Sequence, residues 1–321
     1  MAVYTILVDE DVEKIRLAFG LSAIIAFKGI AEGVSNSNFF LETEDARFIL
    51  TIYEAMTDIK ELPFFLGATL FAAQNDLPTA LPIKTIDGNL TFEINGKTCA
   101  LCSFLRGYSP KTPNVAMVRS AGRALANLHI KLQNYDLKRE NDLGPNAWKN
   151  MWQKIAIDAN KSEIGVKALI DNDIAIIDEK WPKSLPKGFI HADLFPDNVL
   201  FIGDEVSGLI DFYFGATDFF AYDLAIMLNA WCFLPLGREF DLTKGRALIQ
   251  GYESVRKLTN EEKESMPLLA LGAALRFYLT RMADWLKPDD GALVNKKDPR
   301  EYSARLAFHR AAITIFDYGS I

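Results

Sequence analysis

Four residues in the second half of the chain have the types and the spacing of a reaction centre. His191 and Asp193 are followed by Asn198, five positions after Asp193, and by Asp211, thirteen positions further on. A carboxylate such as that of Asp193 can orient a hydroxyl group and accept its proton. The amide of Asn198 and the carboxylate of Asp211 offer the hard oxygen ligands that Mg²⁺ prefers. Together these groups fit the transfer of a phosphoryl group from a nucleotide to a hydroxyl group.

A turn rich in Asp and Asn is the competing interpretation of these residues. The side chains of HADLFPDNVL can cap local turns, and Asp211 can simply end a strand. Each residue alone favours that interpretation. The full set instead matches the pattern H-x-D-x-x-x-x-N followed by a D-F-G-like segment, here LIDFYFG, that marks phosphoryl-transfer sites. We therefore predict that Asp193 is catalytic, that Asn198 and Asp211 bind Mg²⁺, and that His191 braces the loop.

The first hundred or so residues read mainly as strands and turns. Apolar stretches such as RFILTIYE and KTCALCSFL predict strands, and one helix is expected from about Asp58 to Gln74. Asn95-Gly96 predicts a β-hairpin, because both residues tolerate positive φ. Cys99 and Cys102 would point to opposite faces of their strand, which favours packed thiols over a metal site.

The rest of the chain reads mostly as amphipathic helices. The exception runs from Pro186 to Asp211, where the sequence predicts a loop, a short strand, a turn at Gly203-Asp204 and another strand. We expect an α+β fold of two domains. The first, residues 1–104, is a small antiparallel sheet with one main helix, and the second, residues 105–321, is larger and mostly helical. The predicted loop and hairpin carry the candidate site.

Composition and charge exclude several classes of protein. The 321 residues include 42 acidic and 35 basic ones, for a net charge of −7, and no Lys/Arg run could follow a phosphate backbone, so no nucleic-acid partner is expected. The longest apolar stretch, Met266 to Leu275, is far shorter than the roughly 20 residues of a membrane span. Three cysteines cannot form a disulfide framework, and no signal peptide is visible. We expect a cytoplasmic protein without a membrane partner.

Several longer stretches resemble a known family. The chain is similar to the aminoglycoside phosphotransferase and choline kinase family, a branch of the protein-kinase-like fold, along nearly its whole length. The family-level stretches include GIAEGVSNSNFFLET, ALANLH, GFIHADLFPDNVLF, LIDFYFG and ALRFYLTR. Within the family, LTIYE and NAWCF look most like the bacterial homoserine kinases of the kinase-like type.

The resemblance implies a bilobal fold in which residues 1–104 bind ATP, residues 105–321 bind the acceptor, and the nucleotide lies in the cleft. Residues 29–38 would cover the phosphates, although a plain hairpin connection is the alternative, and residues 104–107 would form the hinge. The implied reaction is the ATP- and Mg²⁺-dependent phosphorylation of L-homoserine to O-phospho-L-homoserine in threonine biosynthesis. The implied nucleotide-binding residues are Gly29, Gly33, Ser35, Asn36, Ser37 and Thr51.

Thr51 marks a departure from the family pattern. Most relatives carry a lysine on the third strand, which holds the α- and β-phosphates, whereas this chain reads Phe48-Ile49-Leu50-Thr51-Ile52. A neutral hydroxyl group cannot replace an ammonium group as a charge partner. Lys28 or Arg47 could compensate, and the alternative for both is a solvated surface cation.

The sequence says least about which residues bind the acceptor. L-Homoserine would need a fixed cation for its carboxylate, and Arg276 and Arg281 are the candidates; an Arg281–Asp284 pair on the helix surface is the alternative. Choline would need an aromatic cage, for which the candidates are Trp231, Phe233, Tyr278 and Trp285. An aminoglycoside would need an acidic pocket, and a nucleotide-binding protein without turnover is a further possibility. We assign Asp223 a structural role at the start of a helix.

Overall fold

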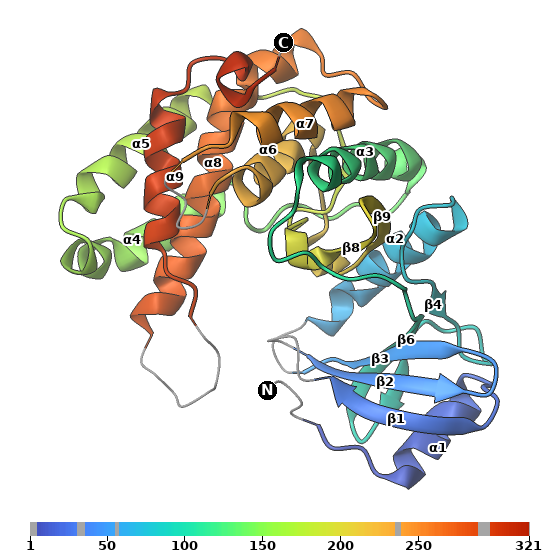
Figure 1. Ribbon diagram of the computed structural model, residues 1–321. Helices are drawn as coiled ribbons and strands as arrows, with labels where there is room; N and C mark the ends of the chain where they lie inside the picture. Colours follow the sequence, from blue (N-terminus) through green and yellow to red (C-terminus); the bar gives the residue numbers. More distant parts are fainter. Residues whose placement is uncertain (1–4, 31–35, 55–57, 235–238, 288–295, 321) are drawn as a thin grey trace. The chain divides into compact units, whose positions relative to one another are not determined.

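The computed structural model describes residues 5–30, 36–54, 58–234, 239–287 and 296–320, and Figure 1 shows its helices and strands. The chain divides into two compact units, Met1–Arg106 and Gly107–Ile321. We expected the boundary after residue 104. The units are described separately below.

The first unit is built on one antiparallel sheet. Its strands lie in the order β1-β2-β3-β6-β4, and β5 pairs with the other end of β6. The strands are β1 (Ile24–Ile30), β2 (Ser37–Thr43), β3 (Arg47–Ile52), β4 (Pro82–Ile83), β5 (Phe92–Ile94) and β6 (Lys97–Ser103). Alternation along β3 buries Phe48, Leu50 and Ile52 on one face and leaves Arg47 and Thr51 on the other.

Two helices accompany this sheet. Helix α1 (Asp9–Ala18) packs Val12 and Ile15 into the same core as Leu50. Helix α2 (Leu62–Gln74) follows the 3₁₀ turn η1 (Ile59–Glu61), which confirms the helix expected there. We expected one helix in this region, and α1 was missed because its apolar stripe is short and three acidic residues open it.

The predicted hairpin is confirmed. Asn95 and Gly96 join β5 to β6 with φ of 52° and 73°, the paired positive values that a two-residue turn needs. The two cysteines of β6 lie on opposite faces, as predicted: Cys99 is buried in the core and Cys102 is partly exposed. Both are free thiols.

The second unit is mostly helical. Its long helices are α3 (Val115–Lys131), α4 (Pro145–Ser162), α5 (Val166–Lys180), α6 (Phe220–Trp231), α7 (Leu242–Glu253), α8 (Asn260–Leu286) and α9 (Arg300–Ala311). Short 3₁₀ turns are η2 (Leu132–Asn134), η3 (Pro196–Asn198), η4 (Phe212–Phe214) and η6 (Ile315–Tyr318). Helix α6 is buried on nearly all sides against α8 and other elements of the unit, and most of its residues are apolar (Figure 1).

Two small antiparallel ribbons interrupt the helices. Strand β8 (Val199–Ile202) pairs with β9 (Glu205–Leu209) through a turn at Gly203, as predicted. Strand β7 (Lys187–Ile190) pairs with β10 (Ala216–Phe219). We had expected β7 to be part of a loop and the end of β10, from Asp218, to belong to a helix. Each is only four residues long, and its pairing partner lies far along the chain, so the local pattern carries little signal.

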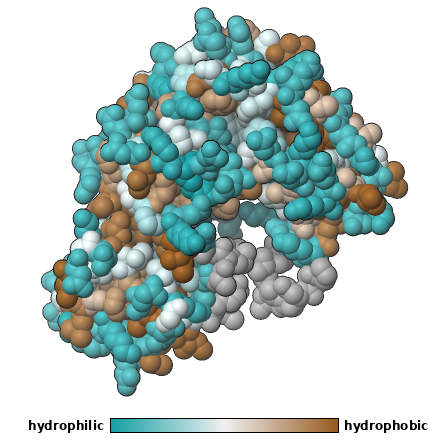
Figure 2. Space-filling model, turned by 180° about the vertical axis from the view of Figure 1, so that it is seen from behind, coloured by the Kyte–Doolittle hydropathy of each residue, from teal (hydrophilic) through white to brown (hydrophobic). Residues whose placement is uncertain are grey.

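The surface is mixed in character. Figure 2 shows hydrophilic residues interspersed with hydrophobic ones on the visible face. Among the helices that the structure describes, none combines the length and the apolar character required to cross a membrane.

Candidate active site

Asp223 holds the backbone of the predicted catalytic loop. The N–H groups of His191 and Ala192 donate to its two carboxylate oxygens at 2.7 and 2.9 Å, and the carboxylate is fully buried. Ala192 has φ of 61°, a left-handed conformation that non-glycine residues rarely adopt. Asp223 lies in the first turn of α6, but it forms no cap there, so it is structural through the loop and not through the helix end.

Two further side chains hold the same segment from the carbonyl side. Arg276 on α8, 2% exposed, donates from Nη1 to the carbonyl oxygen of Ala192 at 2.5 Å. Trp231 at the end of α6 donates from Nε1 to the carbonyl oxygen of Leu194 at 2.7 Å. Because a buried backbone group without a partner is costly, these side chains fix the conformation of the loop.

A buried hydrogen-bonded chain extends from Asp223 to α3 and α7. His129 on α3 contacts Asp223 Oδ2 through Nε2 at 3.1 Å and the hydroxyl group of Tyr252 on α7 through Nδ1 at 2.8 Å. Burial alone would raise the pKa of Asp223, but the hydrogen bonds from His129 and from the His191 N–H group oppose this effect, and the pKa is lowered. The carboxylate that holds the loop is therefore kept in its ionised form.

His191 takes a bracing position. Its Nε2 lies 3.0 Å from the carbonyl oxygen of Ile210, next to Asp211, and its ring is fully buried beside Phe212. Burial lowers the pKa of His191, so the ring is neutral and donates from Nε2 to that carbonyl. This contact ties the segment before Asp193 to the segment that carries Asp211.

The β8–β9 hairpin brings Asn198 and Asp211 to one end. Asn198 directly precedes β8, and Asp211 follows β9 after one residue. Val199 pairs with Leu209, and the N–H of Ile210 donates to the carbonyl oxygen of Asn198 at 3.1 Å. Asn198 Nδ2 also donates to the Asp193 carbonyl oxygen at 2.8 Å and to Asp193 Oδ2 at 3.2 Å. All three predicted functional residues therefore lie together.

This arrangement fits a Mg²⁺ ion. The amide of Asn198 uses its Nδ2 for Asp193, which leaves Oδ1 as the ligand atom, and Asp211 is an exposed residue. Mg²⁺ is typically bound through one or two protein oxygens, with phosphates and waters completing its coordination. Within the described part of the chain, no cluster of three or more His, Cys, Asp or Glu residues offers an all-protein site instead.

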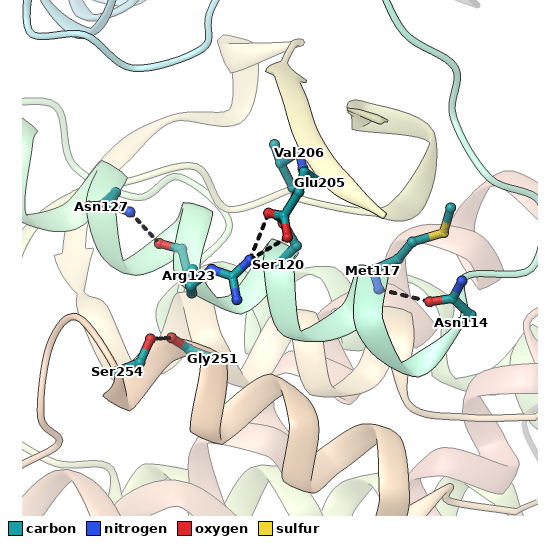
Figure 3. Close-up of polar contacts among 9 residues, drawn as sticks. All are labelled: Asn114, Met117, Ser120, Arg123, Asn127, Glu205, Val206, Gly251 and Ser254. Atoms are coloured by element: carbon teal, nitrogen blue, oxygen red, sulfur yellow. Dashed lines mark hydrogen bonds and ion pairs between the residues drawn. The ribbon is translucent and has the colours of Figure 1, made fainter. Parts of the chain in front are cut away.

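The far end of the hairpin is fastened to α3 (Figure 3). Ser120 Oγ donates to Glu205 Oε2 at 2.9 Å and accepts the N–H of Val206 at 3.0 Å. Arg123 Nη2 donates to both oxygens of Glu205, at 2.7 and 3.0 Å. At the turn, Asn114 Nδ2 donates to Asp204 Oδ1 at 2.8 Å. Sequence reasoning missed these contacts, which set the position of the hairpin against α3.

The surroundings of Asp193 raise the pKa of its carboxyl group towards neutral pH. Loss of water contact raises the pKa of Asp193 to about 7. The Arg276 guanidinium group opposes this shift, while the carboxylates of Asp211 and Asp197 reinforce it. A general base acts best when its pKa lies near the working pH, so the environment of Asp193 suits proton transfer.

A small cavity opens beside Asp193. Its volume is about 170 Å³, and it is lined by Asp193, Phe195, Asp197, Phe277, Thr280, Arg281 and Lys297. Of the two predicted acceptor-binding arginines, Arg281 lines the cavity, whereas Arg276 holds the loop. The suggested Arg281–Asp284 surface pair is wrong: Arg281 Nη1 pairs with Glu301 at 2.9 Å, and Asp284 pairs with Lys287.

The aromatic residues considered for a choline cage have other contacts. Trp231 donates to the loop and lies edge-on to Phe201, Phe233 packs among Phe240 and Phe308, and the Tyr278 hydroxyl group donates to Glu163. Trp285 lies under the guanidinium group of Arg300. The four side chains are therefore part of separate packing groups.

The predicted nucleotide-binding residues that the structure describes lie in the first unit. Gly29 belongs to β1, opposite Phe39 of β2. Thr51 Oγ1 donates to Asn38 Oδ1 across the β2–β3 pair at 2.8 Å. Asn36 Oδ1 accepts the N–H of Glu54 at 3.2 Å. Gly33 and Ser35 lie outside the described residues.

Ser37 has a structural contact of its own. Its buried hydroxyl group donates to Glu54 Oε1 at 2.7 Å and accepts the N–H of Thr5 at 3.0 Å. Lys97 pairs with the other oxygen of Glu54 at 2.5 Å. The side chain of Ser37 is thus engaged within the unit, so its role towards phosphate stays a prediction that rests on its N–H group.

Register places Lys28 on the same face of the sheet as Thr51. Lys28 pairs with Phe40, and Phe40 pairs with Ile49, two residues from Thr51 on β3. The other candidate, Arg47, is paired with Glu42 at 2.8 Å. Arg47 lies on this face as well, so its ion pair, and not its position, makes Lys28 the stronger of the two candidates.

Comparison with known proteins agrees with this geometry. Residues 26–258 match the model of the phosphotransferase enzyme family. The chain belongs to this family. Full-length relatives of this phosphotransferase include the homoserine kinase of Rhizobium meliloti (strain 1021), 48% identical over 99% of this chain and 98% of that protein. The homoserine kinase of Phenylobacterium zucineum (strain HLK1) is 47% identical over 100% of this chain and 99% of that protein.

Solved structures share the fold of this phosphotransferase at low sequence identity. An amicoumacin kinase in complex with AMP-PNP and Ca²⁺ superimposes with a TM-score of 0.68 at 16% identity, covering 95% of this chain and 93% of that one. Spectinomycin phosphotransferase in complex with ADP gives a TM-score of 0.64 at 13% identity, covering 98% of both chains. The expected kinase-like α+β fold is thereby confirmed.

Proposed function

We propose that this phosphotransferase is a homoserine kinase, which transfers the γ-phosphoryl group of ATP to the hydroxyl group of L-homoserine. The observation that carries the proposal is the small cavity beside Asp193, which contains both cationic and anionic side chains. Full-length relatives that carry the name homoserine kinase support it. The product, O-phospho-L-homoserine, places the enzyme in threonine biosynthesis.

In the proposed mechanism, Asp193 accepts a hydrogen bond from the acceptor hydroxyl group and takes its proton as the oxygen attacks the γ-phosphorus in line. The bond from that phosphorus to the β,γ-bridging oxygen breaks, and ADP leaves. Asn198 positions the Asp193 carboxylate and, with Asp211, would hold Mg²⁺. When bound, that ion would neutralise charge on the nucleotide phosphates. Asp223 and Arg276 act through the loop backbone, so that Asp193 does not have to be reoriented at the moment of transfer.

The size and charge of the cavity distinguish the candidate acceptors. Pockets for drug-sized ligands measure roughly 300–1,000 Å³, so a cavity of about 170 Å³ suits an acceptor of a few heavy atoms better than an aminoglycoside. The two cations in its wall also oppose a polycation. The separate packing of the four aromatic residues removes the argument for choline.

Residues 1–106 supply the nucleotide site in this proposal, with Gly29, Asn36, Ser37 and Thr51 near the phosphates and Lys28 as the compensating cation. The cytoplasm is the compartment that we propose, because ATP is available there and the three cysteines are free thiols.

The test is a measurement of ATP consumption with a panel of acceptors. It includes L-homoserine, L-serine, choline, ethanolamine and an aminoglycoside, with product identification by phosphorus NMR. We expect turnover to be highest with L-homoserine and to yield O-phospho-L-homoserine. A higher kcat/KM with choline or an aminoglycoside would contradict the proposal, and ATP binding without turnover of any acceptor would favour an inactive nucleotide-binding protein.

A further inference from the structure

The cavity beside Asp193 contains charges of both signs at its wall. Arg281 and Lys297 bring positive charge, and Asp193 and Asp197 bring negative charge. An amino-acid acceptor carries the same combination, a carboxylate and an ammonium group, together with the hydroxyl group that reacts. The question is which side chain binds which end of the acceptor.

Most donors in the wall are already engaged. Arg281 is paired with Glu301 at 2.9 Å, and its guanidinium group lies over the ring of Tyr302. The hydroxyl group of Thr280 donates to carbonyl oxygens of its own helix, at 3.2 and 3.3 Å. The charge of Arg281 is therefore already compensated by Glu301, and the neutral hydroxyl group of Thr280 cannot balance the charge of an incoming carboxylate.

Lys297 differs from these groups. Its side chain is exposed, and its only recorded contact within the described part of the chain is with the ring face of Phe195, 5.9 Å from the ring centroid. That contact places its ammonium group beside the loop that carries Asp193, close enough for its charge to favour the ionised form of the Asp193 carboxyl group and so to oppose the rise in its pKa. A cation held at a cavity wall by an aromatic ring can bind an anion without first leaving an acidic partner.

Asp197 is the matching group on the acidic side. Asp193 has to serve the reacting hydroxyl group, and its Oδ2 already accepts from Asn198. Asp197 is exposed, and only its backbone carbonyl has a recorded partner in the described structure, the hydroxyl group of Ser109. Its carboxylate is therefore available for an ammonium group.

We propose that Lys297 binds the carboxylate of the acceptor and Asp197 binds its ammonium group, so that the cavity selects a small zwitterion with a terminal hydroxyl group. This inference rests on the proposed function. It adds two specificity residues that lie on separate elements, Asp197 in η3 and Lys297 before α9. Neither residue alone would distinguish an amino acid from a simple amine or a simple hydroxy acid.

The test removes one charge at a time from the enzyme and from the acceptor. L-Homoserine is compared with 3-aminopropan-1-ol, which lacks the carboxylate, and with 4-hydroxybutanoate, which lacks the ammonium group. Each analogue is measured as a substrate or, where turnover is too slow, as an inhibitor competitive with L-homoserine. The variants are Lys297→Met and Asp197→Asn, each with a melting curve. Lys296→Met is the control, because Lys296 donates to the carbonyl oxygen of Lys287 and does not line the cavity.

We expect a crossed pattern. Lys297→Met should weaken kcat/KM, or the inhibition constant, by about 10- to 100-fold for the two carboxylates and by less than about threefold for 3-aminopropan-1-ol, as the loss of one charge-assisted hydrogen bond predicts. Asp197→Asn should have the same effect on kcat/KM, or on the inhibition constant, for the two compounds with an ammonium group, L-homoserine and 3-aminopropan-1-ol. The values for 4-hydroxybutanoate should change little. Lys296→Met should leave all three unchanged.

Two outcomes separate this inference from the proposed function. If the wild-type enzyme uses L-homoserine but either variant weakens all three compounds equally, the charge assignment is wrong and the kinase assignment stands. If the wild-type enzyme prefers an amine without a carboxylate, both are wrong. Preference for another hydroxy amino acid would correct the acceptor, and the crossed pattern measured with that amino acid would still support Lys297 and Asp197.

Discussion

The two units hold their candidate functional residues in different ways. In the second unit, buried side chains from α6 and α8 hold the backbone of the catalytic loop: Asp223, Trp231 and Arg276. In the first unit, the polar residues at the strand ends contact neighbouring side chains of the same sheet, such as Thr51 with Asn38. The contact between Thr51 and Asn38 joins two neutral side chains that are only partly buried.

This difference indicates that the catalytic loop is held more rigidly than the strand ends of the first unit. A backbone held by buried charged groups cannot shift without breaking several hydrogen bonds, so Asp193 is fixed before substrates bind. The side-chain contacts in the first unit are partly exposed and worth less individually. We therefore expect large effects from substitutions in the loop and its supports, and graded effects in the sheet.

Asp193→Asn should have the largest effect on activity. The variant keeps the size of the side chain but removes the proton acceptor, so kcat should fall by roughly 10²- to 10⁴-fold. Binding of ATP and the melting temperature should change little. The measurement is kcat with L-homoserine, with a nucleotide Kd from calorimetry. A variant that binds ATP and retains more than about a tenth of wild-type kcat would show that Asp193 is only a turn residue.

Asp223→Ala should have the largest effect on stability. It leaves two loop N–H groups and His129 without their buried partner, which should lower the free energy of unfolding by about 3 to 5 kcal/mol. Urea denaturation measures this change. Asp178→Ala is a matched control, because Asp178 forms an exposed pair with Lys149, and it should change stability by less than about 1 kcal/mol. Equal effects would remove the distinction between the buried and exposed carboxylates.

Lys28→Ala sharpens the comparison in the first unit. If Lys28 compensates for the neutral side chain of Thr51, its loss should raise the KM for ATP by about three- to tenfold, as removal of one exposed charge contact predicts. Arg47→Ala should raise it less, because Arg47 is paired with Glu42. Initial-rate kinetics at saturating L-homoserine give both values. If neither variant changes the KM, the compensating cation is a different residue.

Ser120→Ala should have the smallest of these effects. Ser120 joins Glu205 and the N–H of Val206 to α3, at the end of the hairpin far from Asn198. Its loss should lower stability by about 1 kcal/mol and leave kcat within about twofold. Thermal unfolding and kcat are measured on the same sample. A drop in kcat of tenfold or more would mean that the α3 contact also positions the metal-binding end.

Features encoded by neighbouring residues were predictable from the sequence. The Asn95-Gly96 and Gly203-Asp204 turns, helix α2 and the grouping of Asp193, Asn198 and Asp211 all follow from short spacings. Helix α1 was not predicted, because its apolar stripe is short and its burial comes from the sheet. The β7–β10 pair joins segments separated by most of the candidate site, and no local pattern encodes that pairing.

The supporting contacts of the site were the least predictable. We expected Arg276 to bind the acceptor, but its contact with Ala192 joins residues 84 positions apart. Three other contacts likewise depend on how the helices pack. They are the ion pair of Arg281 with Glu301, the effect of the Lys297 charge on Asp193 and the support that Asp223 gives the loop. Asp197 had a local signal, since it lies within the motif directly before Asn198, and Lys297 had none.

The left-handed conformation of Ala192 has a consequence for the order of events during folding. The contact that stabilises it, from the His191 and Ala192 N–H groups to Asp223, joins residues more than thirty positions apart, and it cannot form until α6 has docked. Helices form within microseconds, whereas contacts between distant segments form later. On dilution from denaturant, the circular dichroism of the helices should therefore recover before turnover does, because a chain with all its helices still lacks an ordered catalytic loop.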